Sequence, residues 1–183
     1  MLVQIARADP GLARRVADVP GALAALITAL ASGGDAAPSS AAALAEIAED
    51  PRLAQRLAEA PGALPALAAA VRGGGGTASS SAAALANITR ANSGLARRVG
   101  EAPGALRALI AAVSANGGAA SDSALALVHI AWTNPGLARR VAEAPGALLA
   151  LFAAEAAGGD TGINGSGALS NIARADPGLA RPV

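Results

Sequence analysis

A short pattern recurs along the chain every 41 or 42 residues. Three markers share this period: a Leu-Ala-Arg-Arg-Val string, a Pro-Gly-Ala-Leu string, and an isoleucine inside a helix-like stretch. The isoleucines are Ile5, Ile47, Ile88, Ile130 and Ile172, and the Pro-Gly pairs begin at Pro20, Pro61, Pro103 and Pro145. Because three independent markers keep one spacing, we expect an array of similar structural units.

Each period predicts three helices. The first opens at an Asp or Asn that can cap it, often followed by Pro, and stops before the next Pro-Gly pair. The second begins at Pro-Gly and has apolar residues at i, i+3, i+4 and i+7, as in Leu23, Leu26, Ile27 and Leu30. It ends in a glycine cluster, and we interpret the run from Gly73 to Gly76 as a flexible connector. After small polar loops, third helices are predicted to start near Ser39, Ser80, Ser121 and Ser166.

Three short helices cannot bury their apolar stripes within one unit, so the units must stack on one another. We therefore predict an all-α solenoid of about four three-helix repeats, forming a single array over residues 1–183. The expected repeats are 9–49, 50–91, 92–133 and 134–175, with partial repeats at 1–8 and 176–183.

A period of this length is typical of HEAT-like and armadillo-like repeats. The string Ala168-Leu169-Ser170-Asn171-Ile172-Ala173 resembles the third-helix motif of armadillo repeats, and residues 84–88 nearly copy it. The Gly-Ala-Leu strings at 21–23, 62–64, 104–106 and 146–148 resemble the start of the armadillo second helix. The resemblance covers the whole chain and implies a right-handed α-solenoid.

The armadillo resemblance also implies a binding site: a concave groove of third helices that holds an extended peptide, with an Asn on each helix bonding the peptide backbone. Transferred by position, this ladder row is Gln4, Glu46, Asn87, His129 and Asn171. A second row, three residues later, is Arg7, Glu49, Arg90, Trp132 and Arg174. The two rows vary between repeats that otherwise match, so we expect them to determine specificity. The alternative is that both rows are ordinary solvated helix surface.

Importin-like armadillo proteins also carry a Trp four residues before each ladder Asn, forming pockets for basic side chains. The matching positions here are Ala42, Ala83, Leu125 and Gly167. We therefore do not expect basic nuclear-signal peptides as ligands.

His129 and Trp132 are the only His and the only Trp in the chain, and they lie one helical turn apart. One interpretation is a patch against which an aliphatic, aromatic or cationic ligand group packs. The other is that Trp132 covers the core between repeats while His129 is a hydrated surface residue.

Composition argues against other classes of protein. The chain has no Cys and one His, and it lacks a nucleophile elbow, so we expect no enzyme, no cofactor and no metal site. The net charge is +1, and paired arginines such as Arg97-Arg98 are followed by acids that suit local ion pairs, so we do not expect nucleic-acid binding. Apolar stretches are too short to span a membrane and no signal peptide is recognisable, so we expect a cytoplasmic or nuclear protein.

The sequence thus predicts a non-enzymatic scaffold that binds an extended peptide or protein segment on its third-helix face. The alternative is a structural array that assembles with copies of itself, a homo-oligomer, because neither end shows the polar terminal repeat usual in such arrays.

Overall fold

The computed structural model describes residues 10–175, and within that range the chain forms twelve α-helices, one 3-10 helix and no strand. The first helices are α2 (Pro10–Asp18), α5 (Pro51–Glu59), α8 (Ser93–Glu101) and α11 (Pro135–Glu143). The second helices are α3 (Ala22–Ser32), α6 (Ala63–Gly73), α9 (Ala105–Ala115) and α12 (Ala147–Ala157). The third helices are α4 (Ala37–Ile47), α7 (Gly75–Ala91), α10 (Ala120–Thr133) and α13 (Gly159–Ala175), and the 3-10 helix η1 (Gly34–Ala36) directly precedes α4. The expected all-α array of three-helix units is confirmed. Gln4, Arg7 and the partial repeats 1–8 and 176–183 lie outside the described residues.

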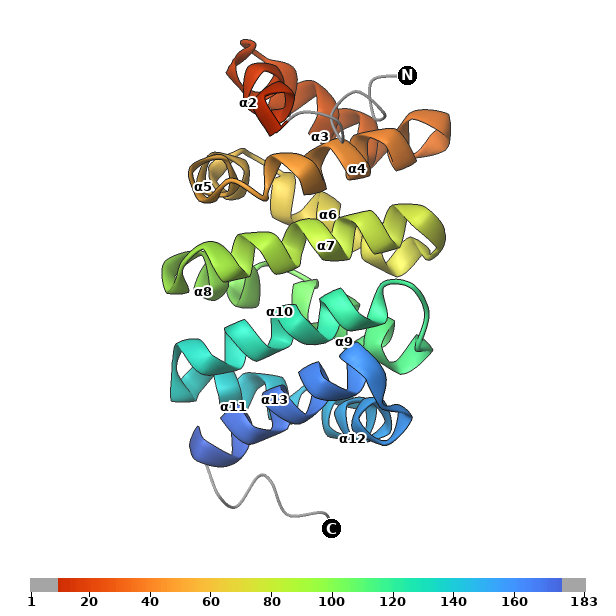
Figure 1. The fold of residues 1–183 in the computed structure, drawn as a ribbon, viewed down its shortest axis with the longest axis vertical. Helices are drawn as coiled ribbons and strands as arrows, with labels where there is room; N and C mark the ends of the chain where they lie inside the picture. Colours follow the sequence, from red (N-terminus) through yellow and green to blue (C-terminus); the bar gives the residue numbers. More distant parts are fainter. Residues whose placement is uncertain (1–9, 176–183) are drawn as a thin grey trace.

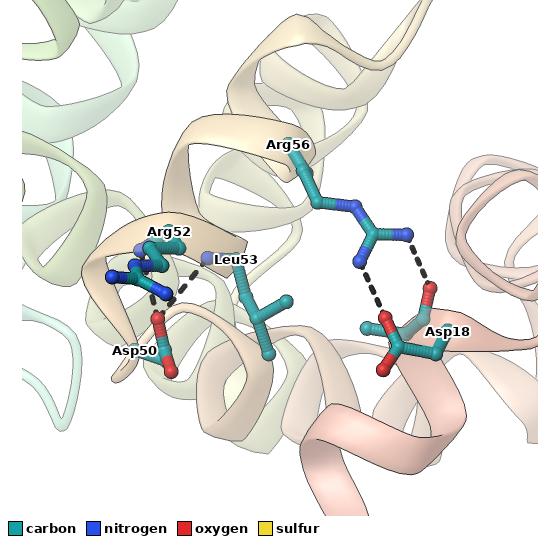
Figure 2. Close-up of polar contacts among 6 residues, drawn as sticks. Asp18, Asp50, Arg52, Leu53 and Arg56 are labelled. Carbon is teal, nitrogen blue, oxygen red and sulfur yellow. Dashed lines mark hydrogen bonds and ion pairs between the residues drawn. The ribbon is translucent and has the colours of Figure 1, made fainter.

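The first helices begin where the Asp and Asn residues predicted their caps. The Asp50 side chain accepts hydrogen bonds from the backbone N–H groups of Arg52 (2.8 Å) and Leu53 (3.4 Å), as Figure 2 shows. Asn92 and Asn134 each accept one bond from the N–H three residues later, at 2.9 and 2.8 Å. These bonds satisfy donors that the first turn of a helix leaves without a partner.

The second helices start directly after the Pro-Gly pair and not at it, as was predicted. Gly21, Gly62, Gly104 and Gly146 all have left-handed backbone conformations, with φ between 76° and 81°. A left-handed residue cannot continue a right-handed helix, and glycine adopts this conformation without steric cost. The Pro-Gly pair is therefore the turn between the first and second helices.

The glycine clusters contain more helix than the sequence predicted. Gly73 ends α6 and Gly75 already begins α7, so only Gly74 lies between them, and the interpretation of residues 73–76 as a flexible connector is wrong. Gly74 and Gly75 have φ values of 77° and 68°, which reverse the chain within two residues. Likewise α13 begins at Gly159, well before Ser166. Packing against neighbouring helices overrides the low helix propensity of these residues.

α4 ends at Ile47, whereas α7, α10 and α13 extend three residues past the matching isoleucine. The sequence explains the difference, because two residues separate Ile47 from its cap Asp50, while three separate Ile88 from Asn92. The shortened chain must leave the helix early so that Asp50 can reach the capping position of α5. Glu49 consequently lies in the turn after α4, where its N–H donates to the Glu46 carbonyl at 3.2 Å.

The third helices form one layer of the molecule. Figure 1 shows α4, α7, α10 and α13 crossing the front one below the other, with α6 and α9 behind them. Each third helix packs against the next, and seven of their large apolar side chains are fully buried: Leu44, Ile47, Leu85, Ile88, Leu127, Ile130 and Ile172. Burying one such side chain contributes about 1.5–3 kcal/mol, so contacts between repeats supply much of the stability. The opposite side of this layer is free to carry polar side chains.

Candidate functional site

The structure places the described members of both rows near the C-terminal ends of the four third helices. Glu46, Asn87, His129 and Asn171 are half-buried. Glu49, Arg90, Trp132 and Arg174 are exposed, and Trp132 is 61% exposed. We call these eight residues the third-helix rows. A polar inner row and a more exposed outer row therefore run across all four repeats.

Two asparagines of the inner row connect neighbouring third helices. Asn87 on α7 donates from Nδ2 to the carbonyl of Ala45 on α4 at 3.4 Å, and Asn171 on α13 donates to the carbonyl of Val128 on α10 at 3.1 Å. Each acceptor directly precedes an inner-row residue, Glu46 or His129. These bonds fix the amide groups at defined positions along the array, and they also give both asparagines a structural role.

Arg90 bonds an inner-row residue of its own helix, and its charge acts on His129 of the next repeat. Its Nη2 atom donates to Asn87 Oδ1 at 3.2 Å. His129 is half-buried and its Nε2 atom is buried without a hydrogen-bond partner. Burial lowers the pKa of His129 below its usual 6.5, and the positive charge of Arg90 lowers it further. His129 is therefore half-buried, in contrast to the hydrated surface residue of the second interpretation, and burial and Arg90 both favour its neutral ring.

Trp132 stacks with the next member of the outer row. The Arg174 guanidinium carbon lies 3.8 Å from the centre of the Trp132 ring, which is a cation–π contact. Trp132 is exposed and does not cover the core between repeats. One face of the ring is occupied by Arg174, and the side chain remains largely accessible.

Sequence reasoning missed a second line of contacts, along the first helices. Arg56 on α5 reaches back to α2, pairing with Asp18 through Nη1 and donating from Nη2 to the Ala17 carbonyl, both at 2.7 Å (Figure 2). Arg98 makes the equivalent backbone bond to Ala58 at 3.3 Å. The sequence held one signal for these contacts, because the arginines of the first helices recur at the repeat period. One of the expected ion pairs within a first helix is present, since Arg97 Nε lies 3.9 Å from Glu101 Oε1. Asp18 instead pairs with Arg56 of the next repeat.

Residues 10–175 contain no group of three or more His, Asp or Glu side chains placed to hold a metal ion. In the same range, no helix combines the length and the apolar character needed to cross a membrane. Cavities of about 250–420 Å³ lie where the helices of adjacent repeats join, as at the Gly33-Gly34 and Gly73-Gly74 turns.

No model of a known protein family matches the sequence, and neither does any curated protein. Solved structures do match. A designed armadillo repeat protein, YIII(Dq)4CqI, is 27% identical with a TM-score of 0.82 over 97% of this chain and 75% of its own. Computationally designed armadillo repeat proteins for modular peptide recognition give 29% identity and a TM-score of 0.73, over 82% of this chain and 64% of theirs. Another design, YIII(Dq.V1)4CPAF, solved in complex with the peptide (KR)4, has a TM-score of 0.81 at 24% identity, over 97% of this chain and 78% of its own. The sequence resemblance is thereby confirmed, and the chain is an armadillo-like repeat solenoid.

Proposed function

We propose that the chain is a binding scaffold that holds an extended peptide against the third-helix rows. The observation that carries this proposal is the set of contacts that join row residues to the neighbouring third helix: α4 with α7 through Asn87, and α10 with α13 through Asn171 and the Trp132–Arg174 pair. These contacts support a surface on which polar and aromatic groups of neighbouring third helices act on one ligand.

The repeat spacing suits an extended peptide. Packed helices lie about 8–10 Å apart, and three residues of extended chain span about 10 Å. One row position can therefore meet every third residue of a ligand. The Asn87 and Asn171 amides each have donor and acceptor groups of the kind that a peptide backbone needs.

The structural neighbours support the same class of function. One set of designs was made for modular peptide recognition, and another was solved with a bound peptide. In this chain the positions of the importin tryptophan pockets hold Ala42, Ala83, Leu125 and Gly167, and Leu125 packs against the core instead. We therefore propose a ligand class different from basic nuclear-signal peptides.

The test is to select twelve-residue peptides from a random displayed library on the purified chain and to measure their affinity by calorimetry. A variant with Arg90→Ser, Trp132→Ala and Arg174→Ser removes exposed groups while leaving both asparagine bonds between helices intact. We expect selected peptides to bind the wild type and to lose at least tenfold in affinity for this variant.

The matched control changes three exposed residues elsewhere, Arg14→Ser, Arg107→Ser and Leu149→Ala. It should bind like the wild type, and both variants should keep the helical circular-dichroism spectrum. Selected peptides that bind the first variant as tightly as the wild type, or a library that yields no binder, would refute the proposal.

Self-assembly is the second candidate, and one observation favours it. Phe152 on α12 is 37% exposed, whereas its counterpart in the preceding repeat, Ile110, is 4% exposed because the following repeat covers it. Ile163 on α13 is also exposed. This candidate predicts a molecular mass in light scattering that rises with concentration and stays monomeric in the Phe152→Ser, Ile163→Ser variant. A monomeric wild type at millimolar concentration would exclude it.

A further inference from the structure

One cavity of the molecule gathers cations from three repeats. It has a volume of about 420 Å³ and lies beside the Pro-Gly turn between α8 and α9. Its charged lining residues are Arg72 of α6, Arg107 of α9, Arg140 of α11 and the acid Glu101 of α8. Three arginines and one glutamate give the lining a net charge of +2. α6 and α9 lie behind the layer of third helices (Figure 1), and no residue of the third-helix rows lines this cavity.

The three arginines are not paired within the described chain. Over residues 10–175, no hydrogen bond or ion pair joins Arg72, Arg107 or Arg140 to another residue. Glu101 has Arg97 of its own helix as a neighbour, at 3.9 Å. A cleft whose charges are mostly of one sign concentrates their field and attracts ions of the opposite sign. The cavity therefore favours an anion.

Arg140 departs from the bonding pattern of its counterparts. Arg56 and Arg98 occupy the same position in their repeats, and each donates to a backbone carbonyl of the preceding first helix. The corresponding acceptor for Arg140 is the carbonyl of Gly100, and the described chain shows no such bond. The guanidinium donors of Arg140 are therefore available to a ligand in the cavity, which Gly100 also lines.

The first turn of α9 is a second feature that favours anions. Its N-cap is Gly104, which has no side chain to bond the open N–H groups of the turn. Gly104, Leu106 and Arg107 all line the cavity. The N-terminal end of a helix carries a partial positive charge, and its N–H groups are suited to binding phosphate. Arginine side chains and an open helix start thus meet at one cavity.

The equivalent cavity one repeat earlier has the opposite charge. It has a volume of about 330 Å³ and lies beside the turn between α5 and α6, where an uncapped helix start recurs. Pro65 occupies there the position that Arg107 has in the next repeat. Its charged lining residues are Arg98, Glu59 and Glu101, which give a net charge of −1. The positive cavity therefore depends on particular residues and not on the repeat geometry.

We infer that the cavity lined by α6, α9 and α11 binds a polyphosphate chain. Its volume of about 420 Å³ falls within the roughly 300–1,000 Å³ of small-molecule sites. The planar fork of arginine matches two phosphate oxygens, and several forks can bond successive phosphate groups. None of the lining residues is aromatic, which favours a bare phosphate chain over a nucleotide. The site shares no residue with the third-helix rows and is independent of the proposed function.

The experiment is calorimetry of sodium tripolyphosphate with the purified chain at about 0.15 M salt. The cavity variant is Arg72→Gln, Arg107→Gln, Arg140→Gln. We expect it to bind at least about tenfold more weakly than the wild type, because each lost guanidinium removes charge-assisted bonds. The matched control removes the same charge at exposed positions of α2 and α5, by Arg14→Gln, Arg15→Gln, Arg52→Gln. The control should bind like the wild type, and both variants should keep the helical circular-dichroism spectrum.

A substitution of opposite effect decides the matter even if the cavity variant does not fold. Glu101→Gln removes the acid from the lining and should tighten binding by roughly twofold to fivefold. Glu59→Gln, at the same position one repeat earlier, should leave the affinity unchanged.

Three results would overturn the inference: a wild type that does not bind millimolar tripolyphosphate, equal losses in the cavity variant and its control, or no gain in Glu101→Gln. ATP has the same phosphate chain with a base attached, and it should bind no more tightly than tripolyphosphate. Tighter binding of ATP would overturn the assignment to a bare phosphate chain.

Discussion

His129 lies half-buried on α10 with one ring nitrogen that has no partner, so its titration reports directly on its surroundings. Its pKa is lowered from 6.5, mainly by burial and then by the charge of Arg90. We predict that Arg90→Gln raises this pKa partway towards 6.5 but not fully, because burial remains. An NMR titration that follows the ring signals of this histidine, the only one in the chain, measures the pKa. Arg98→Gln is the control and should leave the value unchanged.

The same shift makes stability depend on pH with a definite sign. Between the lowered folded pKa and 6.5, the unfolded chain binds more protons than the folded one. His129 therefore leaves the free energy of unfolding unchanged above about pH 6.5 and reduces it as the pH falls towards the folded value. A His129→Gln variant should lose this part of the pH dependence. Identical pH profiles for the variant and the wild type would contradict this.

Ser81 and Ser123 are fully buried on the third helices, and neither hydroxyl has a hydrogen-bond partner. A buried hydroxyl without a partner costs about 1–3 kcal/mol, and alanine also has the higher helix propensity. We predict that Ser81→Ala and Ser123→Ala each raise the free energy of unfolding by about 1 kcal/mol. Urea unfolding measures this free energy. The control is Ser114→Ala at an exposed site on α9, which should change the free energy of unfolding little. Destabilisation by either buried change would show that its hydroxyl does have a partner.

At the scale of helices, Gly162 and Gly165 allow α13 to lie close to α12. A Cβ on Gly165 would come within 3.0 Å of the Leu151 carbonyl oxygen and 3.1 Å of Ala154 Cβ. Backbone atoms cannot yield as a flexible side chain can, so we predict that Gly165→Ala costs about 1–3 kcal/mol. Gly76 lies in the first turn of α7 with open space around it, so Gly76→Ala should instead gain up to about 1 kcal/mol. Thermal unfolding should show a lower melting temperature for Gly165→Ala and a higher one for Gly76→Ala than for the wild type. A shift of both melting temperatures in the same direction would contradict this.

Helix identity and capping could be predicted from the sequence because they depend on local chemistry. The Asp50, Asn92 and Asn134 caps follow from residue type and position alone. The helical start of α7 and α13 could not be predicted, since isolated glycine-rich segments favour coil and only packing against neighbouring helices orders them. The early end of α4 was implicit in the shortened spacing between Ile47 and Asp50.

The candidate site was predictable in its positions and not in its contacts. The armadillo resemblance gave the inner row and helical spacing gave the outer row, and the structure shows that their described members lie near one end of the third helices. The resemblance did not indicate that Asn87 and Asn171 bond the preceding helices, or that Arg174 stacks on Trp132. Such contacts depend on rotamers and on the offset between helices, which a repeat pattern does not specify. The division into repeats at residues 49, 91 and 133 stays a prediction.

At the scale of the whole molecule, binding on the third-helix rows would involve all four repeats together. Neighbouring units of such an array stabilise one another, so a ligand that spans several repeats should suppress local opening of each. Binding at the exposed apolar residues of α12 and α13 would affect one end only. The location of a bound peptide therefore separates the scaffold from the self-assembling array.

The most direct measurement is NMR mapping of a library-selected peptide titrated into the isotope-labelled chain. The indole N–H of Trp132, the only Trp, gives a single resonance that identifies the outer row. We predict that this signal and the side-chain amides of Asn87 and Asn171 shift together along one saturation curve, while the capping amides of Asn92 and Asn134 do not move. Shifts centred on Phe152 and Ile163, or on the first helices, with the Trp132 signal unmoved, would contradict peptide binding on the third-helix rows.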